Sequence, residues 1–215
     1  MVTVDLDQTR TELMQTGLPA DLADSDPVQV VQEWISFAWD AGMFNADAMA
    51  VASVDVEGRP SVRNVLMKDV IDGGFCFYTN YESQKGVELL ATGAVEALFS
   101  WLPLERQIRV RGTVELVTAE QSDRYFDTRP RGSQIAAVAS DQSREIPSRE
   151  WIEQRYREVE TEHEGSDVPR PEHWGGLRIV PERIEFWQGH RFRLHNRLVF
   201  ERIDDGAWTT AWLAP

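Results

Sequence analysis

Hydrophobic and polar positions follow a helical period in one early stretch of the chain. Asp26 is suited to cap a helix, and Pro27 fits the first helical position after it. Apolar side chains then recur three to four residues apart, at Val31, Trp34, Ile35 and Ala38. Because a glycine commonly ends a helix, the pattern predicts an amphipathic helix between Pro27 and Gly42.

Further along, the pattern changes to a period of two, which is typical of strands with one buried face. Two strands within 48–70, joined by a turn at Glu57-Gly58, are followed by predicted strands at 74–80, 94–101, 106–117, 177–187, 192–202 and 207–213. Helices are predicted at 85–91, between a Thr118–Gln121 capping box and Pro130, and after Ser148. Short strands interrupted by a few helices indicate an α+β fold on an antiparallel sheet or barrel.

The ends and the charge of the chain limit the classes of protein to consider. Residues 1–26 are polar and acidic without a clear period, so we expect a flexible N-terminal arm before a single domain at 27–215. The net charge of −14 argues against nucleic acid or an anionic membrane as partner, since both require a basic face. No apolar run approaches the ~20 residues of a transmembrane helix, and no signal peptide opens the chain. We therefore expect a cytoplasmic protein.

Cysteine and histidine give no sign of metal chemistry. The single cysteine, Cys76, lies in an apolar strand pattern and is expected to be an inert buried thiol. The four histidines are His163, His173, His190 and His195, and none has Cys or His at zinc-like spacing. No metal site is expected.

Arginines gather in three groups in spite of the negative charge of the chain. The groups are Arg106, Arg109 and Arg111, then Arg124, Arg129 and Arg131, then Arg191, Arg193 and Arg197. Such clusters require carboxylate partners or a bound anion. The stretch 125–143 contains Tyr125 with Arg129 and Arg131 of the second group and ends in a Gln-Ser pair, so it has the donors of an anion site.

The chain has only two lysines, and both lie in settings that suit phosphate. Lys85 follows a strand just where a helix begins, and a helix N-terminus favours anions through its unpaired N–H groups. Lys68 comes five residues after Arg63, which would place the two on opposite faces of a continuous strand. We expect phosphate binding at these lysines in preference to solvated surface charge.

Two strand segments carry groups suited to a planar ring. The Gln107 amide offers a heterocycle both a donor and an acceptor. Trp187 supplies an aromatic wall, and Arg193, His195 and Arg197 alternate in the predicted strand 192–202, so they would project to one side. These residues predict a pocket for planar, phosphate-bearing ligands, with two phosphate sites.

Seven motifs together resemble one known family. They are RNVLMKD, FYTNYESQKG, LERQIRVRGTVE, YFDTRPRGSQIAAVASDQS, WGGLRI, IEFWQG and RLHNR, in this order. In order and spacing they are similar to the pyridoxine (pyridoxamine) 5′-phosphate oxidases. The resemblance implies an antiparallel split β-barrel with flanking helices, and a homodimer with FMN at each of two subunit interfaces. It also implies oxidation of pyridoxamine or pyridoxine 5′-phosphate by O₂ to pyridoxal 5′-phosphate and H₂O₂, with ammonia from the amine.

The same resemblance implies roles for individual residues. FMN would be bound by Arg63, Asn64, Val65, Leu66, Met67, Lys68, Tyr78, Thr79, Gln84, Lys85, Gln107, Gln142, Ser143, Trp187 and Arg197. The small-molecule substrate would be bound by Lys68, Tyr125, Arg129, Ser133, Arg193, Leu194, His195 and Arg10. Arg193 and His195 would be the catalytic residues at the reacting end.

Four positions depart from the family pattern. Gln84 replaces a frequent Arg, Asn196 a frequent Asp, Trp212 a frequent Arg, and Leu13 a Tyr of a substrate-covering segment.

Two other functions stay open from the sequence. One is a related flavin oxidase acting on another ring, such as a phenazine precursor; Lys68, Tyr125, Arg129 and Ser133 together favour a phosphorylated substrate instead. The other is a flavin- or pyridoxal-phosphate-binding protein without turnover, against which Arg193 and His195 weigh.

Overall fold

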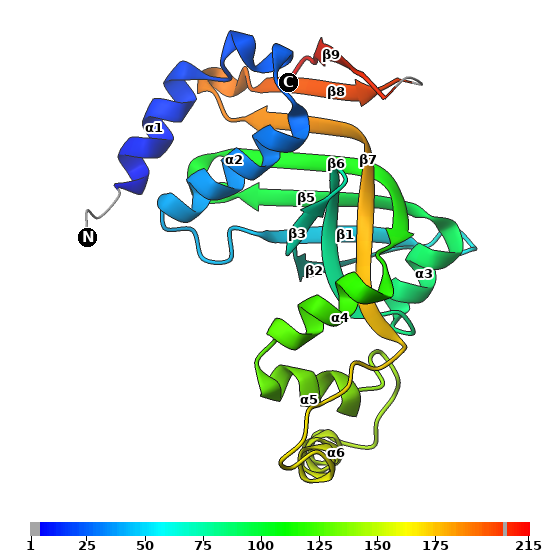
Figure 1. The fold of residues 1–215 in the computed structure, drawn as a ribbon. Helices are drawn as coiled ribbons and strands as arrows, with labels where there is room; N and C mark the ends of the chain where they lie inside the picture. Colours follow the sequence, from blue (N-terminus) through cyan, green and yellow to red (C-terminus); the bar gives the residue numbers. More distant parts are fainter. Residues whose placement is uncertain (1–4, 204–205) are drawn as a thin grey trace.

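The computed structural model describes residues 5–203 and 206–215, which form one antiparallel sheet with helices at its two ends (Figure 1). The helices are α1 Leu6–Thr16, α2 Pro27–Asp40, α3 Gln84–Thr92, α4 Ala119–Thr128, α5 Arg131–Ala139 and α6 Arg149–Glu162, with 3-10 turns at Ala20–Asp24, Leu102–Leu104 and Arg191–Arg193. The strands are β1 Ala48–Val54, β2 Pro60–Leu66, β3 Asp69–Ile71, β4 Gly74–Asn80, β5 Ala94–Trp101, β6 Arg106–Leu116, β7 Trp174–Gln188, β8 Asn196–Arg202 and β9 Trp208–Trp212. None of the described helices combines the length and apolarity that a bilayer crossing requires.

The long strand β7 organises the sheet. The described strands pair in the order β2-β1-β5-β6-β7-β4-β3, and β8 and β9 continue from β7. The first half of β7 pairs with β4 and the second half with β8, while β6 follows it along both. At the bulge after Arg111, Gly112 is required because the Val180 carbonyl oxygen occupies the space of a Cβ. The sheet curls without closing, which confirms the predicted α+β split barrel.

The main core lies between the curled sheet and α2. Phe75, Phe99 and Phe186 are fully buried, and burial contributes about 1.5–3 kcal/mol for each such side chain. Trp34 of α2 meets Phe186 edge to face, with ring centroids 5.2 Å apart. Cys76 is buried as predicted, and burial raises the pKa of its thiol to about 11, which keeps it protonated and unreactive. A second, smaller core joins α4, α5 and α6.

The N-terminal segment, which shows no clear period in the sequence, contains regular structure from residue 5 onward. Asp5 caps α1, whose Leu13 packs on the main core, and Leu18 and Leu22 of the following segment are buried. The apolar positions of this region are too widely spaced to give a visible helical period. Residues 1–4 lie outside the described residues, and the mobility of the arm and the boundary at residue 27 stay predictions.

The other element predictions are confirmed with three exceptions. The predicted strand 192–202 is wrong in its first four residues, because β8 begins at Asn196 and both Phe192 and Arg193 have positive φ angles of 58° and 60°. Arg193 and His195 therefore do not alternate along a strand. The short strand β3 was not predicted, and neither was α5, because Pro130 ends α4 and also directly precedes α5.

Candidate functional site

A cavity of about 820 Å³ opens between β2, β4 and α3 on one side and α4 and α5 on the other. Its lining consists of Ser61, Val62, Arg63, Asn64, Val65, Leu66, Lys68, Tyr78, Thr79, Asn80, Gln84, Lys85, Tyr125, Arg129, Ala136, Ala137, Ser140, Gln142, Ser143 and Trp174. Four of these residues are cationic, and none of the described lining residues is a carboxylate. In a chain of net charge −14, this composition marks a site for an anionic ligand.

Lys85 occupies the first turn of α3, which Ser83 caps by accepting a hydrogen bond from the Gly86 N–H. The Lys85 ammonium group donates to Thr79 Oγ1 and Gln142 Oε1, both at 2.9 Å, and these are neutral acceptors. Burial, reinforced by the charge of Arg63, lowers the pKa of Lys85 to about 8. A cation without a carboxylate partner at a helix N-terminus is suited to phosphate.

Arg63 and Lys68 face the same cavity, in contrast to the prediction of opposite faces. The strand β2 ends at Leu66, so the alternation of side chains does not extend to Lys68. The Lys68 ammonium group pairs with Asp47 Oδ2 at 2.7 Å.

Aromatic rings from β4, α4 and β7 form another part of the cavity lining. Tyr78 and Tyr125 stack with centroids 3.7 Å apart, and the Arg129 guanidinium lies 4.4 Å from the centroid of Trp174. Burial lowers the pKa of Arg129, and its Nη1 atom is buried without a hydrogen-bond partner in the described structure. A buried donor left unpaired in a native fold calls for a ligand or a water molecule.

Other arginines of the three groups have partners within the chain. Arg109 pairs with Glu96, and Arg197 pairs with the buried Glu185 at 2.8 Å. Arg106 lies over the Trp34 ring, 4.1 Å from its centroid, and donates to Gln188. These contacts with carboxylates or aromatic rings account for the positions of the three arginines, and no bound anion is needed to explain them.

A second group of predicted site residues lies together on β6, β7 and β8. Gln107 is the register partner of Trp187, and Trp187 is the register partner of Arg197. The ring of His195 packs on Trp187 with centroids 4.7 Å apart. None of the three register partners lines the cavity. Trp174 and Trp187 lie at opposite ends of β7, and thirteen residues of extended strand span roughly 40 Å.

Six other predicted residues are also outside the lining of the cavity: Met67, Ser133, Arg10, Leu194 and the catalytic candidates Arg193 and His195. Arg10 pairs with Asp7 on α1 at 3.1 Å, and Leu194 is exposed.

Sequence reasoning missed several residues of the site. Ser61, Asn80, Ala136, Ala137, Ser140 and Trp174 line the cavity without having been assigned to it. Trp174 belongs to the WGGLRI motif, which pointed to it without a role. The alanines lie in α5, a helix that the pattern did not predict, and Ser140 follows directly after its last residue.

The fold and the cavity define a class: an antiparallel split barrel with a cation-lined cavity between sheet and helices. Residues 38–163 match the family model of pyridoxamine 5′-phosphate oxidase, and residues 174–215 match the pyridoxine 5′-phosphate oxidase C-terminal dimerisation region. The chain belongs to the pyridoxamine 5′-phosphate oxidase family, a family of oxidoreductases.

The sequence is similar to individual members of the family over nearly its whole length. The chain is 48% identical to the pyridoxine/pyridoxamine 5′-phosphate oxidase of Rubrobacter xylanophilus, over 98% of this chain and 97% of that protein. It is 45% identical to that of Ralstonia pickettii, over 96% and 97%. Among solved structures it is similar to PhzG from Burkholderia lata 383 in complex with tetrahydrophenazine-1-carboxylic acid. That comparison gives a TM-score of 0.87 and 30% identity over 94% of this chain and 100% of that chain.

Proposed function

We propose that the protein is an FMN-dependent oxidase that converts pyridoxamine 5′-phosphate and pyridoxine 5′-phosphate to pyridoxal 5′-phosphate. The acceptor would be O₂, which yields H₂O₂, and the amine substrate would also release ammonia. The observation that carries the proposal is the carboxylate-free cavity with Arg63, Lys68, Lys85 and Arg129. The names of the similar proteins support the substrate class.

The residues present fit a flavin phosphate and a substrate phosphate. Lys85 and Arg63, together with the N-terminus of α3, would hold the FMN phosphate, since Lys85 has only neutral partners. Arg129 would bind the substrate phosphate with the Nη1 donor that the fold leaves unpaired, beside Tyr125 and Lys68. When bound, FMN would accept two electrons from the substrate carbon and pass them to O₂.

We further propose that two copies of the chain complete each site. Gln107, Trp187 and Arg197 are not among the residues that line the cavity, and Trp187 lies at the end of β7 opposite the lining residue Trp174, which favours a site that takes the two groups from different chains. The region that matches the dimerisation model, residues 174–215, contains Trp187, His195 and Arg197. A homodimer would place this group of one copy against the cavity of the other.

His195 and Arg193 would act at the reacting end of the substrate. His195 Nδ1 accepts a hydrogen bond from the His190 backbone N–H at 3.3 Å. In the neutral ring the proton is then on Nε2, which is free to donate to the substrate. The Arg193 guanidinium would help to hold the reacting end of the substrate in position for the transfer.

One experiment tests the function. The purified protein is incubated in air with FMN and pyridoxamine 5′-phosphate, and pyridoxal 5′-phosphate and H₂O₂ are followed. We expect both products in equal amounts. The similarity to PhzG favours a reduced phenazine carboxylic acid as the competing substrate class. If the protein oxidises such a compound but not pyridoxamine 5′-phosphate, our proposal is refuted in favour of that function. Flavin binding without any turnover would indicate a carrier.

FMN affinity should fall as the pH rises through about 8. The pKa of Lys85 is lowered to about 8, so its ammonium group loses its proton in this range and with it the attraction for phosphate. We expect roughly a tenfold loss of affinity between pH 7 and pH 9.5, the order of one charge-assisted hydrogen bond. Titration of flavin fluorescence at several pH values measures it.

Lys85→Arg is the matched control, because an arginine keeps its charge over the whole range. Its FMN affinity should be nearly independent of pH. An equal decline in the variant and in the wild type would assign the titration to another group.

A further inference from the structure

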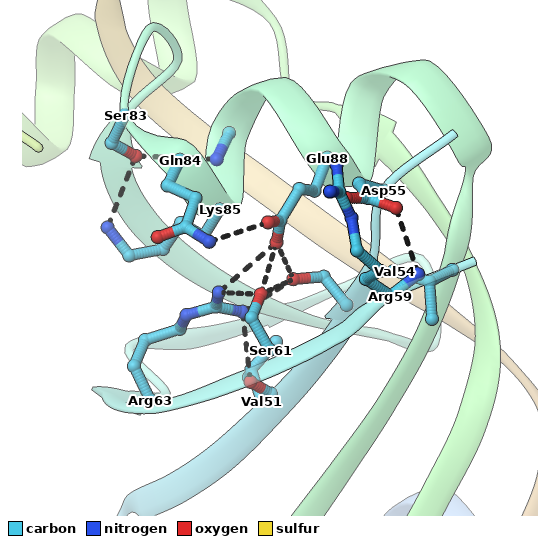
Figure 2. Close-up of polar contacts among 12 residues, drawn as sticks. Val51, Val54, Asp55, Arg59, Ser61, Arg63, Ser83, Gln84, Lys85 and Glu88 are labelled. Carbon is cyan, nitrogen blue, oxygen red and sulfur yellow. Dashed lines mark hydrogen bonds and ion pairs between the residues drawn. The ribbon is translucent and has the colours of Figure 1, made fainter. Parts of the chain in front are cut away.

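Glu88 is a buried carboxylate whose side chain points toward Ser61 and Arg63 (Figure 2). It lies on α3, one turn after Gln84, and its side chain is only 8% exposed. Its Oε2 atom accepts hydrogen bonds from Ser53 Oγ and Ser61 Oγ, both at 2.5 Å, and its Oε1 atom accepts from Gln84 Nε2 at 2.8 Å. Glu88 is not part of the cavity lining.

The same serines hold the guanidinium of Arg63. Its Nη1 donates to Ser53 Oγ at 2.6 Å and to the Val51 carbonyl at 3.2 Å. Its Nη2 donates to Ser61 Oγ at 2.5 Å and lies 3.2 Å from Glu88 Oε2. An arginine has five N–H donors, so these contacts leave the Nε–H for the cavity.

The two serine hydroxyl groups connect Glu88 to Arg63 through hydrogen bonds. A serine has one proton, and each serine here accepts from Arg63 while donating that proton to Glu88. Burial alone would raise the pKa of Glu88, but the hydrogen bonds from Ser53, Ser61, Gln84 and Arg63 outweigh it and lower the pKa to about 2. The group is therefore a carboxylate throughout the neutral range.

We propose that Glu88 is a positioning residue that fixes the Arg63 guanidinium for the phosphate of the bound ligand. The inference rests on the proposed function, in which Arg63 and Lys85 hold the FMN phosphate. Gln84 contributes no charge at this end of the cavity, so Arg63 and Lys85 supply the positive charge, and the orientation of Arg63 determines how closely its own charge approaches the phosphate. A buried carboxylate that orients a ligand-binding cation limits its rotation before binding and so lowers the entropic cost.

The test compares the dissociation constants of FMN and of riboflavin, which lacks the phosphate. Glu88→Ala should weaken FMN binding about tenfold or more and riboflavin binding by less than about twofold. Glu88→Gln retains an acceptor oxygen for the serines, so its loss of FMN affinity should be smaller than that of Glu88→Ala.

Glu57→Ala is the matched control. Glu57 is an exposed carboxylate on the turn between β1 and β2 and pairs with Arg59 at 2.9 Å. The substitution removes the same charge and leaves Arg63 in place, so the preference for FMN over riboflavin should not change. Ser53→Ala, which alters no charge, should lower that preference in the same direction as Glu88→Ala and tests the proposal if Glu88→Ala does not fold.

Two results would overturn the inference. One is an unchanged preference for FMN in both Glu88→Ala and Ser53→Ala with wild-type melting temperatures. The other is tighter FMN binding in Glu88→Ala, which would make the carboxylate a repelling charge instead of a support. Failure of the wild type to bind FMN at all would instead refute the proposed function and the inference with it.

Discussion

Arg129→Ala should raise the KM for pyridoxamine 5′-phosphate about a hundredfold and change kcat by less than about threefold. A buried charge-assisted contact contributes about 1.5–3 kcal/mol, and a hundredfold change corresponds to about 2.7 kcal/mol. The effect falls on KM because a phosphate far from the reacting carbon is bound alike in the ground state and the transition state. Steady-state kinetics with FMN at saturation measure it.

Arg129→Lys provides the control for charge. Lysine keeps the positive charge but loses the planar contact with Trp174, which Arg129 makes at 4.4 Å. We expect a KM between those of the wild type and Arg129→Ala. A hundredfold fall in kcat at unchanged KM would place Arg129 at the reacting end and refute the assigned role.

His195→Ala should lower kcat about a hundredfold or more and leave the KM and FMN affinity nearly unchanged. The Nε2–H of His195, directed by the His190 N–H on the other side of the ring, would hold the reacting end of the substrate. A misplacement of the reacting atoms by about 1 Å can cost about 10² in rate. Arg193→Ala should reduce kcat in the same direction. Single-turnover reduction of the flavin by substrate reports this step directly.

His190→Ala is the matched control for His195→Ala. It removes a neighbouring imidazole but keeps the backbone N–H that donates to His195 Nδ1 at 3.3 Å. Its kcat should stay within about threefold of the wild type, which is the size of a weak surface effect. Equal losses in the two variants would mean that loop distortion, not the His195 ring, controls the rate.

Local signals predicted those parts of the fold that local contacts control. The Thr118–Gln121 capping box forms as predicted, and Asp26 with Pro27 begins α2. Tertiary contacts decided the rest. The helix α1 has few apolar positions and is stabilised in part by the packing of Leu13, and the left-handed φ angles of Phe192 and Arg193 have no sequence signature.

The residues alone and the family resemblance predicted different parts of the site. Residues alone indicated phosphate at Lys85 and in the stretch 125–143, and the family resemblance supplied the remaining positions. Neither the residue pattern nor the family resemblance pointed to Glu88, because its contacts with Ser53 and Arg63 join segments that are 35 and 25 residues apart. Spacing along the chain predicts neighbours only within one helix or strand.

Mixed dimers test most directly whether two chains share each site. Arg129→Ala and His195→Ala chains, with different affinity tags, are expressed together, and the doubly tagged dimer is assayed below the KM of the Arg129→Ala variant. One of its two sites should combine an intact cavity with an intact His195. Random pairing should give about a quarter of the wild-type activity in the unfractionated mixture, and about half in the purified mixed dimer. Activity no higher than the mean of the two parent variants would contradict a site built from two chains.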